Sequence, residues 1–371
     1  MDHNFTKTYK LKQWTPMIHF QHDQSGATLR ATEVKPKLDR FLHEKYGAKA
    51  KLWMISDKSA LDYKMSIRCF DKKTGEPHAL FYGNMGRAPE KKARTVMSDN
   101  IEMTIVCFDP ELMKAIDESL GEFFLVTNFG TMQNKGFGSF TVAGRDFSVG
   151  EISQALRKAS GAEKCYSFIN NSYDQAFDRI KIIYGIMKSG VNFRGYSRSL
   201  LFRFMHERYS IGNEKAYLKQ NKMAPAIGQG HADKKDESNH YVRALLGVGD
   251  HIDFINSKEN KRDKTSIKIE SKDIQRLASP VFFKVIDNRV YFVGNRLNDE
   301  IYGRPFRFSV PQKGQGSDFT PEKKEAVLNV PEKSVLGDDF IDRFMEYAVK
   351  ELNRSEMKKF RETGSVVIKE V

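Results

Sequence analysis

The residues best suited to chemistry lie in a glycine-rich segment, positions 128–140. Three glycines fall within nine residues of this segment: Gly130, Gly136 and Gly138. Glycine permits positive φ angles and lets the backbone approach a partner closely. Exposed backbone N–H groups and the side chains of Gln133, Asn134 and Lys135 suit contact with phosphate, and Phe137 either stacks on a base or packs inward. The segment ends in neither a Walker motif nor a dinucleotide fingerprint, so it is a phosphate-contacting loop or simply a tight turn.

A second segment places three cations at the start of an expected helix, 33–46. Arg30, Lys35 and Lys37 lie at or just inside its N-terminus. The helix dipole and these charges together favour phosphate. A solvated basic helix start is the alternative.

A third segment mixes arginine with aromatic residues. Arg194, Arg198 and Arg203 are interleaved with Phe193 and Tyr196. Cations and ring faces over a short span suit single-stranded RNA. A charged helix flank explains the same pattern.

The histidines and cysteines argue against a metal or cofactor site. The nine histidines form no HExxH or HxH motif, and the three cysteines form no CxxC pair. Cysteines in such apolar surroundings indicate buried thiols in a reducing cytoplasm. His19 and His22, near the end of the first expected strand, are weak candidates for the general base of a metal-independent ribonuclease. A structural or exposed role is the alternative for both.

Elements expected in the first 150 residues alternate between strand and helix. They are strands at 13–21, 63–70, 101–108 and 139–142, and helices at 33–46 and 110–124, with a long loop over 71–99. This order is that of a ferredoxin-like fold, an antiparallel sheet of four strands with both helices on one face. The open face of such a sheet commonly binds RNA.

Residues 151–371 form a second, more helical domain. Helices are expected at 173–187, 199–207, 214–220 and 338–352, and strands at 281–286, 290–293 and 306–310. Loops are expected over 223–238, 250–265 and 311–332. The whole is an α+β chain of tandem ferredoxin-like (RRM-like) domains, the second divergent.

Composition bounds the class of partner. The 371 residues are 40% hydrophobic and 29% charged, with no apolar run long enough to cross a membrane and no secretory signal. Lys and Arg number 61 and Asp and Glu 48, a formal charge of +13. We therefore expect a cytoplasmic protein that binds a polyanion, above all nucleic acid, and no membrane.

The sequence resembles the RAMP (repeat-associated mysterious protein) superfamily of CRISPR type III systems, most closely the two-domain first subunit of Cmr-type complexes. The likeness lies in five stretches, 14–20, 26–36, 134–140, 242–247 and 276–284. It implies binding of guide or target RNA inside an antiviral ribonucleoprotein, with other RAMP subunits as partners. Carried over by position, the RNA contacts are Lys135, Gly136, Phe137 and Gly138, supported by Arg30, Lys35, Arg276 and Ser279.

Three functions follow from these observations. The first is a non-catalytic RNA-binding subunit. The second is a metal-independent endoribonuclease that processes CRISPR RNA. The third is a protein-interaction scaffold whose basic charge only aids solubility.

Overall fold

The computed structural model describes residues 5–19, 28–55, 59–75, 95–192, 196–226, 238–256, 263–274, 277–310, 320–354 and 366–371. The chain divides into two compact units. Unit 1 contains residues 1–177, 282–293 and 369–371, and unit 2 contains 178–281 and 294–368. The domains predicted at 1–150 and 151–371 are each continuous in sequence. Unit 1, in contrast, also includes two short segments from later in the chain, 282–293 and 369–371. Within the described residues no helix is long and apolar enough to cross a membrane.

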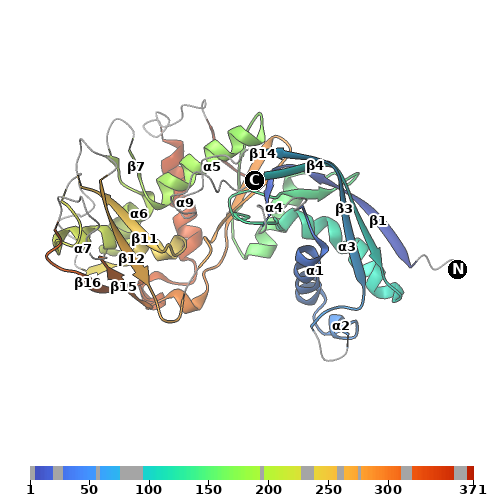
Figure 1. The fold of residues 1–371 in the computed structure, drawn as a ribbon, viewed down its shortest axis with the longest axis horizontal. Coiled ribbons are helices and arrows are strands. Elements are labelled where there is room, and N and C mark those ends of the chain that lie inside the picture. The colour runs from blue at the N-terminus through green and yellow to red at the C-terminus, as the bar shows by residue number, and fades with distance from the viewer. Residues whose placement is uncertain are drawn as a thin grey trace. The chain divides into compact units, whose positions relative to one another are not determined.

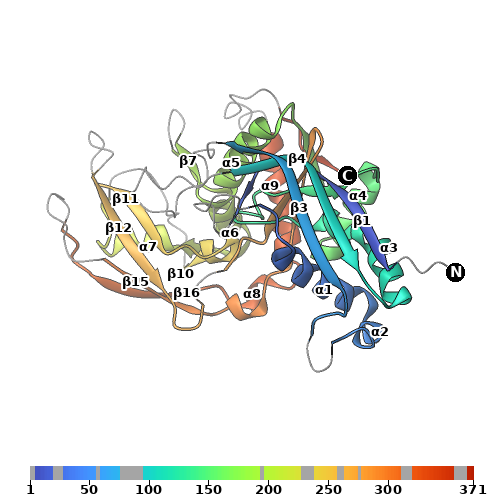
Figure 2. The ribbon, with the colours of Figure 1, turned by 45° about the vertical axis from the view of Figure 1, so that its right-hand side comes forward.

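The first sheet of unit 1 has the strand order of a ferredoxin-like fold. Its strands are β1 (Thr6–Gln13), β2 (Met17–Ile18), β3 (Lys64–Gly75), β4 (Thr95–Val106) and β5 (Phe140–Val142). The main path is β3-β4-β1-β5, all antiparallel, and the short β2 pairs with the start of β4. Figure 2 shows β3, β4 and β1 side by side.

Two helices cover one face of this sheet. They are α1 (Ala31–Tyr46) and α3 (Pro110–Val126), and α2 (Ala48–Lys51) and α4 (Val149–Ser160) complete the helices of the first half. Leu38 of α1 and Ile116 of α3 are buried in one core with Leu11 and Met103 of the sheet. The predicted start of α3 is confirmed, because the Asp109 carboxylate accepts hydrogen bonds from the backbone N–H groups of residues 111 and 112.

The predictions for the first half miss one strand and shorten two. The strand expected at 13–21 is only β2, and β1 precedes it. Residues 71–75 and 95–99, expected in a loop, extend β3 and β4, since residues 72–75 pair with 95–98 in the same ladder. Residues 76–94 and 20–27 lie outside the described part of the chain.

A second sheet repeats the same topology with strands taken from distant parts of the chain. It contains β6 (Tyr166–Ile169), β13 (Val281–Ile286), β14 (Arg289–Gly294) and β17 (Lys369–Glu370), in the order β13-β14-β6-β17. Helix α5 (Tyr173–Lys188) follows β6, and α9 (Phe340–Asn353) precedes β17. The order is again β-α-β-β-α-β, so the tandem ferredoxin-like α+β fold is confirmed (Figure 1).

The segments inserted into this second fold make up much of unit 2. Its other helices are α6 (Leu200–Tyr209), α7 (Glu214–Gln220) and α8 (Lys333–Leu336), with 3₁₀ turns η2 (Val242–Leu246) and η3 (Asp299–Ile301). Short strands pair as β7 (Val191–Asn192) with β8 (Tyr196–Ser197), and β9 (Ile211–Asn213) with β10 (Ser238–His240). An antiparallel meander joins β11 (His251–Ile255), β12 (Lys264–Glu270), β15 (Pro305–Ser309) and β16 (Glu325–Asn329).

The meander corrects two predicted loops. Residues 250–265 contribute β11 and the start of β12, and residues 311–332 contribute β16. Burial alternates along each of these strands, with Phe254 and Ile267 inside and charged side chains outside. The strand expected at 306–310 is confirmed as β15.

Candidate RNA interface

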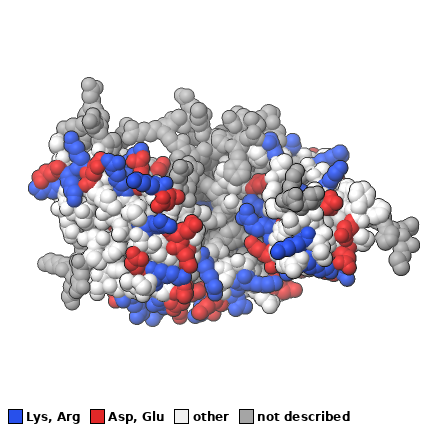
Figure 3. Space-filling view, turned by 90° about the horizontal axis from the view of Figure 1, so that it is seen from below, with Lys and Arg blue, Asp and Glu red and all other residues white. Residues whose placement is uncertain are grey.

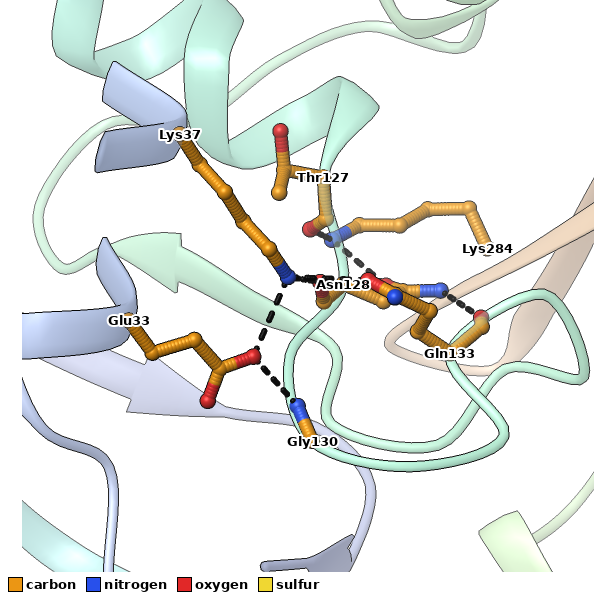
Figure 4. Close-up of polar contacts among 7 residues, drawn as sticks. All are labelled: Glu33, Lys37, Thr127, Asn128, Gly130, Gln133 and Lys284. Carbon is orange, nitrogen blue, oxygen red and sulfur yellow. Dashed lines mark hydrogen bonds and ion pairs between the residues drawn. The ribbon is translucent and has the colours of Figure 1, made fainter. Parts of the chain in front are cut away.

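The glycine-rich loop is held by polar side chains of two elements, α1 and β13 (Figure 4). The Lys37 ammonium of α1 donates to Glu33 Oε1 at 3.1 Å, to the Asn128 carbonyl at 3.0 Å and to Gln133 Oε1 at 2.8 Å. Glu33 Oε1 in turn accepts the Gly130 N–H at 2.7 Å. Burial lowers the pKa of Lys37, and the Glu33 carboxylate opposes this shift. Lys37 and Gln133, predicted as phosphate contacts, are therefore brought together and bind each other.

Lys284 of β13 closes the other side of the loop. Its side chain is fully buried, and its nitrogen lies within hydrogen-bond distance of four oxygens. These are the carbonyls of Phe124, Thr127 and Phe140 and the side-chain oxygen of Asn128, at 2.7, 2.8, 3.2 and 3.1 Å. Burial, with the nearby charge of Lys37, lowers the pKa of Lys284 well below its usual range. The side chain satisfies carbonyls left over at the end of α3.

The loop backbone is bonded within unit 1. The N–H of Gly138 donates to the Pro16 carbonyl, that of Thr131 to the Ile18 carbonyl, and that of Gly136 to the Gln133 carbonyl. Gly138 has a φ of 64°, and a Cβ there would lie 2.0 Å from the Phe129 carbonyl oxygen. The glycine therefore allows backbone to pack on backbone, and these N–H groups bind protein oxygens rather than facing solvent.

The predicted RNA contacts of the loop are mostly buried. Phe137 packs inward, 1% exposed, and stacks on Phe177 with 4.1 Å between ring centroids, so it presents no face to a base. Gly136 is also buried. Asn134 accepts the backbone N–H of Phe283, and the Lys135 nitrogen lies 5.8 Å from the centroid of that same ring. RNA contact by these residues stays a prediction, and the structure assigns them contacts inside unit 1.

The three cations at the start of α1, Arg30, Lys35 and Lys37, are all half-buried. Arg30 is half-buried at the N-cap position. Lys35 pairs with Asp39 at 2.8 Å and lies 4.1 Å from the centroid of the Tyr63 ring. His19 is 5% exposed, and burial lowers its pKa. The contacts of Lys35 with Asp39 and Tyr63 give that cation a structural role.

The other predicted residues that the structure describes belong to unit 2. Arg203 is half-buried and paired with Glu351 at 2.9 Å, and the Ser279 hydroxyl accepts the backbone N–H of Val281 at 3.2 Å. Arg198 is half-buried. His22, Arg194 and Arg276 lie outside the described residues.

The exposed charge of unit 1 gathers instead on the open face of its first sheet. We call this the basic sheet face, and it carries Lys10, Lys12, Lys64, Arg68 and Glu102. Lys10 and Arg68 stand on either side of Glu102 in the strand register. All four cations are exposed, and none forms an ion pair with any residue the structure describes. The face therefore presents four cations against one carboxylate.

Hydroxyl groups lie between these charges. Thr8, Thr104 and Ser66 stand opposite one another across the three strands, and the Thr8 and Thr104 hydroxyls are 3.1 Å apart. Lys12 lies over the Trp14 ring, 3.7 Å from its centroid. Cations, hydroxyls and a half-buried aromatic ring on one surface are the donor set that phosphate and sugar contacts use.

The meander of unit 2 has an open face of the same kind with balanced charge. We call it the balanced sheet face. Lys264 pairs with Asp253 at 3.8 Å, Lys268 with Glu270 at 2.5 Å, and Arg307 with Glu325. Each cation there has an acidic partner. Figure 3, viewed from below Figure 1, likewise shows basic and acidic side chains interspersed. An unbalanced surface such as the basic sheet face is therefore not a general property of the described part of this chain.

Sequence reasoning missed the basic sheet face because it missed β1. A signal was present: Tyr9 and Leu11 alternate with Lys10 and Lys12. A period of two with lysine on one side marks a half-buried strand whose outer face is cationic.

Groups for metal binding were also sought in the structure. Within the described ranges, no three side chains of His, Cys, Asp or Glu lie close enough together to hold a metal ion.

Comparison with known proteins identifies the family. A model described as the Cmr1 N-terminal domain matches residues 4–191, and one described as the Cmr1 C-terminal domain matches residues 196–370. A crystal structure of apo Cmr1 from Pyrococcus furiosus matches with 9% identity and a TM-score of 0.41, covering 98% of each chain.

A cryo-EM structure of the type III-B Cmr-beta complex bound to cognate target RNA matches with 13% identity and a TM-score of 0.29. That match covers 38% of this chain and 59% of the other. No curated protein sequence matches the chain. The two family models together span nearly the whole sequence, and the RAMP resemblance is confirmed: this chain belongs to the Cmr1 family.

Proposed function

We propose that this protein is a non-catalytic RNA-binding subunit of a type III CRISPR effector, and that the basic sheet face holds the RNA. Membership of the Cmr1 family supports the effector. The observation that carries the RNA contact is a set of four exposed cations that have no ion pair with any described residue: Lys10, Lys12, Lys64 and Arg68. One relative with a solved structure is a complex bound to target RNA.

Electrostatics favours this face over the balanced sheet face. An exposed cation paired with a carboxylate, like Lys268 with Glu270, has already lost most of its attraction for a phosphate. Unpaired lysines and arginines keep that attraction and release counterions when they contact RNA. The hydroxyls between them add sequence-independent contacts to phosphate and sugar. The expected ligand is a single strand read through its backbone.

A titration with matched variants tests the proposal. The variant Lys10→Ala/Arg68→Ala removes two cations from the basic sheet face. Lys268→Ala/Arg307→Ala removes two from the balanced sheet face. Binding of single-stranded RNA is measured by filter binding at low salt. The first variant should bind roughly tenfold or more weakly, and the second should match the wild type. Equal losses in both variants, or no RNA binding by the wild type, would contradict the proposal.

The glycine-rich loop is tested in the same assay. Lys135→Ala leaves the basic sheet face unchanged, so its affinity for RNA should equal that of the wild type. A loss as large as that of the Lys10→Ala/Arg68→Ala variant would place the RNA at the loop, as the family resemblance implies for Lys135, Gly136, Phe137 and Gly138.

The burial of His19 supports a non-catalytic role. A general base must reach the proton it removes, and the His19 side chain is 5% exposed with a pKa lowered by burial. Incubation of the protein with CRISPR repeat RNA in EDTA should leave the RNA intact. Cleavage that survives chelation and disappears in a His19→Ala or His22→Ala variant would establish the endoribonuclease instead.

A further inference from the structure

Unit 2 contains a cluster of cations that the proposed RNA contact does not use. Lys188 at the end of α5, Lys215 in α7 and Arg243 in η2 are all half-buried. Both α5 and α7 contact η2, and the side chain of Glu214 at the start of α7 is fully buried. Glu214 Oε1 accepts from Arg243 Nε at 2.5 Å, and its Oε2 accepts the backbone N–H of Val242 at 3.0 Å. Glu214 is therefore bonded to Arg243 and to the backbone of η2, and its charge also acts on Lys188 and Lys215.

The position of Lys188 is fixed by backbone oxygens. Its ammonium donates to the Gly247 carbonyl at 2.7 Å, and Tyr184, one turn earlier on α5, donates to the Leu246 carbonyl at 2.7 Å. Gly247 has a φ of 103°, and a Cβ there would lie 3.1 Å from the Ser279 nitrogen. The backbone around η2 is therefore tightly packed, and the Lys188 ammonium lies against its end at Gly247.

Lys215 differs from its neighbours. It follows Glu214 directly and has no hydrogen bond or ion pair with another residue in the described ranges. The charged groups that face it are Arg243, Glu214 and Lys219, and those that face Lys188 are Arg243 and Glu214. Burial, then repulsion by Arg243, lowers the pKa of each of these two lysines to about 7. Their positive charge is thus unfavourable while the cluster is empty.

We propose that Lys188, Lys215 and Arg243 form a binding site for a phosphate dianion. With Glu214 satisfied by Arg243 and by the backbone of η2, the cluster carries an excess of two positive charges when both lysines are protonated. A dianion would neutralise this excess, and half-buried cations bind it more strongly than exposed ones. Inorganic phosphate and the terminal phosphate of an RNA share this chemistry. The site lies in unit 2 and does not depend on the basic sheet face.

The test measures thermal unfolding of the full chain at about pH 7, where lysines of pKa about 7 are about half protonated and a substantial part of the phosphate is the dianion. Inorganic phosphate should raise the Tm of the wild type by a few degrees relative to chloride at equal ionic strength. Lys215→Met should show no such rise. Without phosphate it should also melt above the wild type, because an unfavourable charge has been removed. Lys268→Met, on the balanced sheet face, is the control and should respond as the wild type does.

Two further measurements complete the test. The first distinguishes this site from the RNA contact on the basic sheet face, and the second distinguishes free phosphate from the terminal phosphate of an RNA. The Lys10→Ala/Arg68→Ala variant should keep the full phosphate response. An RNA with a terminal phosphate that raises the Tm more than the same RNA without it identifies the strand end as ligand, and equal responses identify free phosphate. A phosphate response of equal size in Lys215→Met and the wild type, or none in either, overturns the proposal.

Discussion

A single lysine in an apolar strand determines how the glycine-rich loop is held. Lys284 is fully buried between Phe283 and Val285, and it supplies hydrogen bonds to carbonyls of α3, the loop and β5. The sequence predicts the strand at 281–286 from its hydrophobic residues. It does not predict the partners of Lys284, because they lie about 150 positions earlier in the chain. Long-range polar contacts of this kind leave no local pattern.

Replacement of Lys284 by methionine should destabilise the protein. The three carbonyl oxygens would stay buried without their donor, at a cost of about 3 kcal/mol. Urea unfolding measures the loss. Lys72→Met, an exposed position on β3, should change the free energy of unfolding by less than about 0.5 kcal/mol. Similar values for the two variants would contradict the role given to Lys284.

Replacing two glycines that have similar φ angles distinguishes the cost of backbone strain from the cost of a steric clash. Gly138 (φ 64°) would place a Cβ 2.0 Å from the Phe129 carbonyl oxygen, whereas Gly144 (φ 75°) has nothing within 4 Å. Gly144→Ala should cost about 1 kcal/mol from the left-handed conformation alone. Gly138→Ala should cost at least about 3 kcal/mol, because backbone must move. Chemical denaturation of both variants checks the difference, and equal costs would contradict the packing described for the loop.

At the scale of elements, helices were predicted more fully than strands. The helices at 33–46, 110–124, 173–187 and 338–352 correspond to α1, α3, α5 and α9 because each has a clear apolar stripe. The sequence analysis does not predict β1, β11 and β12, because polar and charged side chains fill their outward positions. The same charged residues form the two open sheet faces. The charged side chains that make the basic sheet face a candidate interface thus also obscure the strand pattern in the sequence.

The junction of α5, α7 and η2 predicts how stability depends on pH. The pKa values of Lys188 and Lys215 fall from the ordinary 10.5 to about 7 in the folded chain. The unfolded chain therefore binds more protons between about pH 7 and about pH 10, and stability rises with pH across that window. Each lysine contributes a slope of up to about 1.4 kcal/mol per pH unit. Lys284, whose pKa is also lowered, adds to the slope with the same sign.

Urea unfolding in phosphate-free buffer at about pH 7 and about pH 9 measures this slope. It should be positive in the wild type and smaller in Lys188→Met. The buried phenols do not interfere in this range, because burial raises the pKa values of Tyr184 and Tyr241 to about 12. Burial raises the pKa of the Cys69, Cys107 and Cys165 thiols, which act against the slope and are the same in both proteins. Equal slopes in the wild type and Lys188→Met would show that Lys188 is charged without penalty.

For the whole molecule, the formal charge of +13 raises the question of whether RNA is attracted generally or at one place. Variants of the two sheet faces distinguish these two possibilities. If four contacts of the basic sheet face dominate, the logarithm of the RNA affinity should fall against the logarithm of salt with a slope of roughly −3. Lys10→Ala/Arg68→Ala should reduce this slope to roughly −1.5, and Lys268→Ala/Arg307→Ala should leave it unchanged. Equal slopes in all three proteins would indicate diffuse attraction.

The distance along the chain between the glycine-rich loop and its buried lysine has a consequence during biosynthesis. Asn128 and Lys284 are 156 positions apart. At ~5–20 residues per second, a ribosome needs roughly 8 to 30 s to travel from one to the other. In the later part of that interval the first ferredoxin-like fold is outside the ribosome while its carbonyls still lack their donor. A nascent chain arrested before residue 284 should therefore be more sensitive to protease at the loop than one arrested far enough beyond β14 for that strand to have left the ribosome.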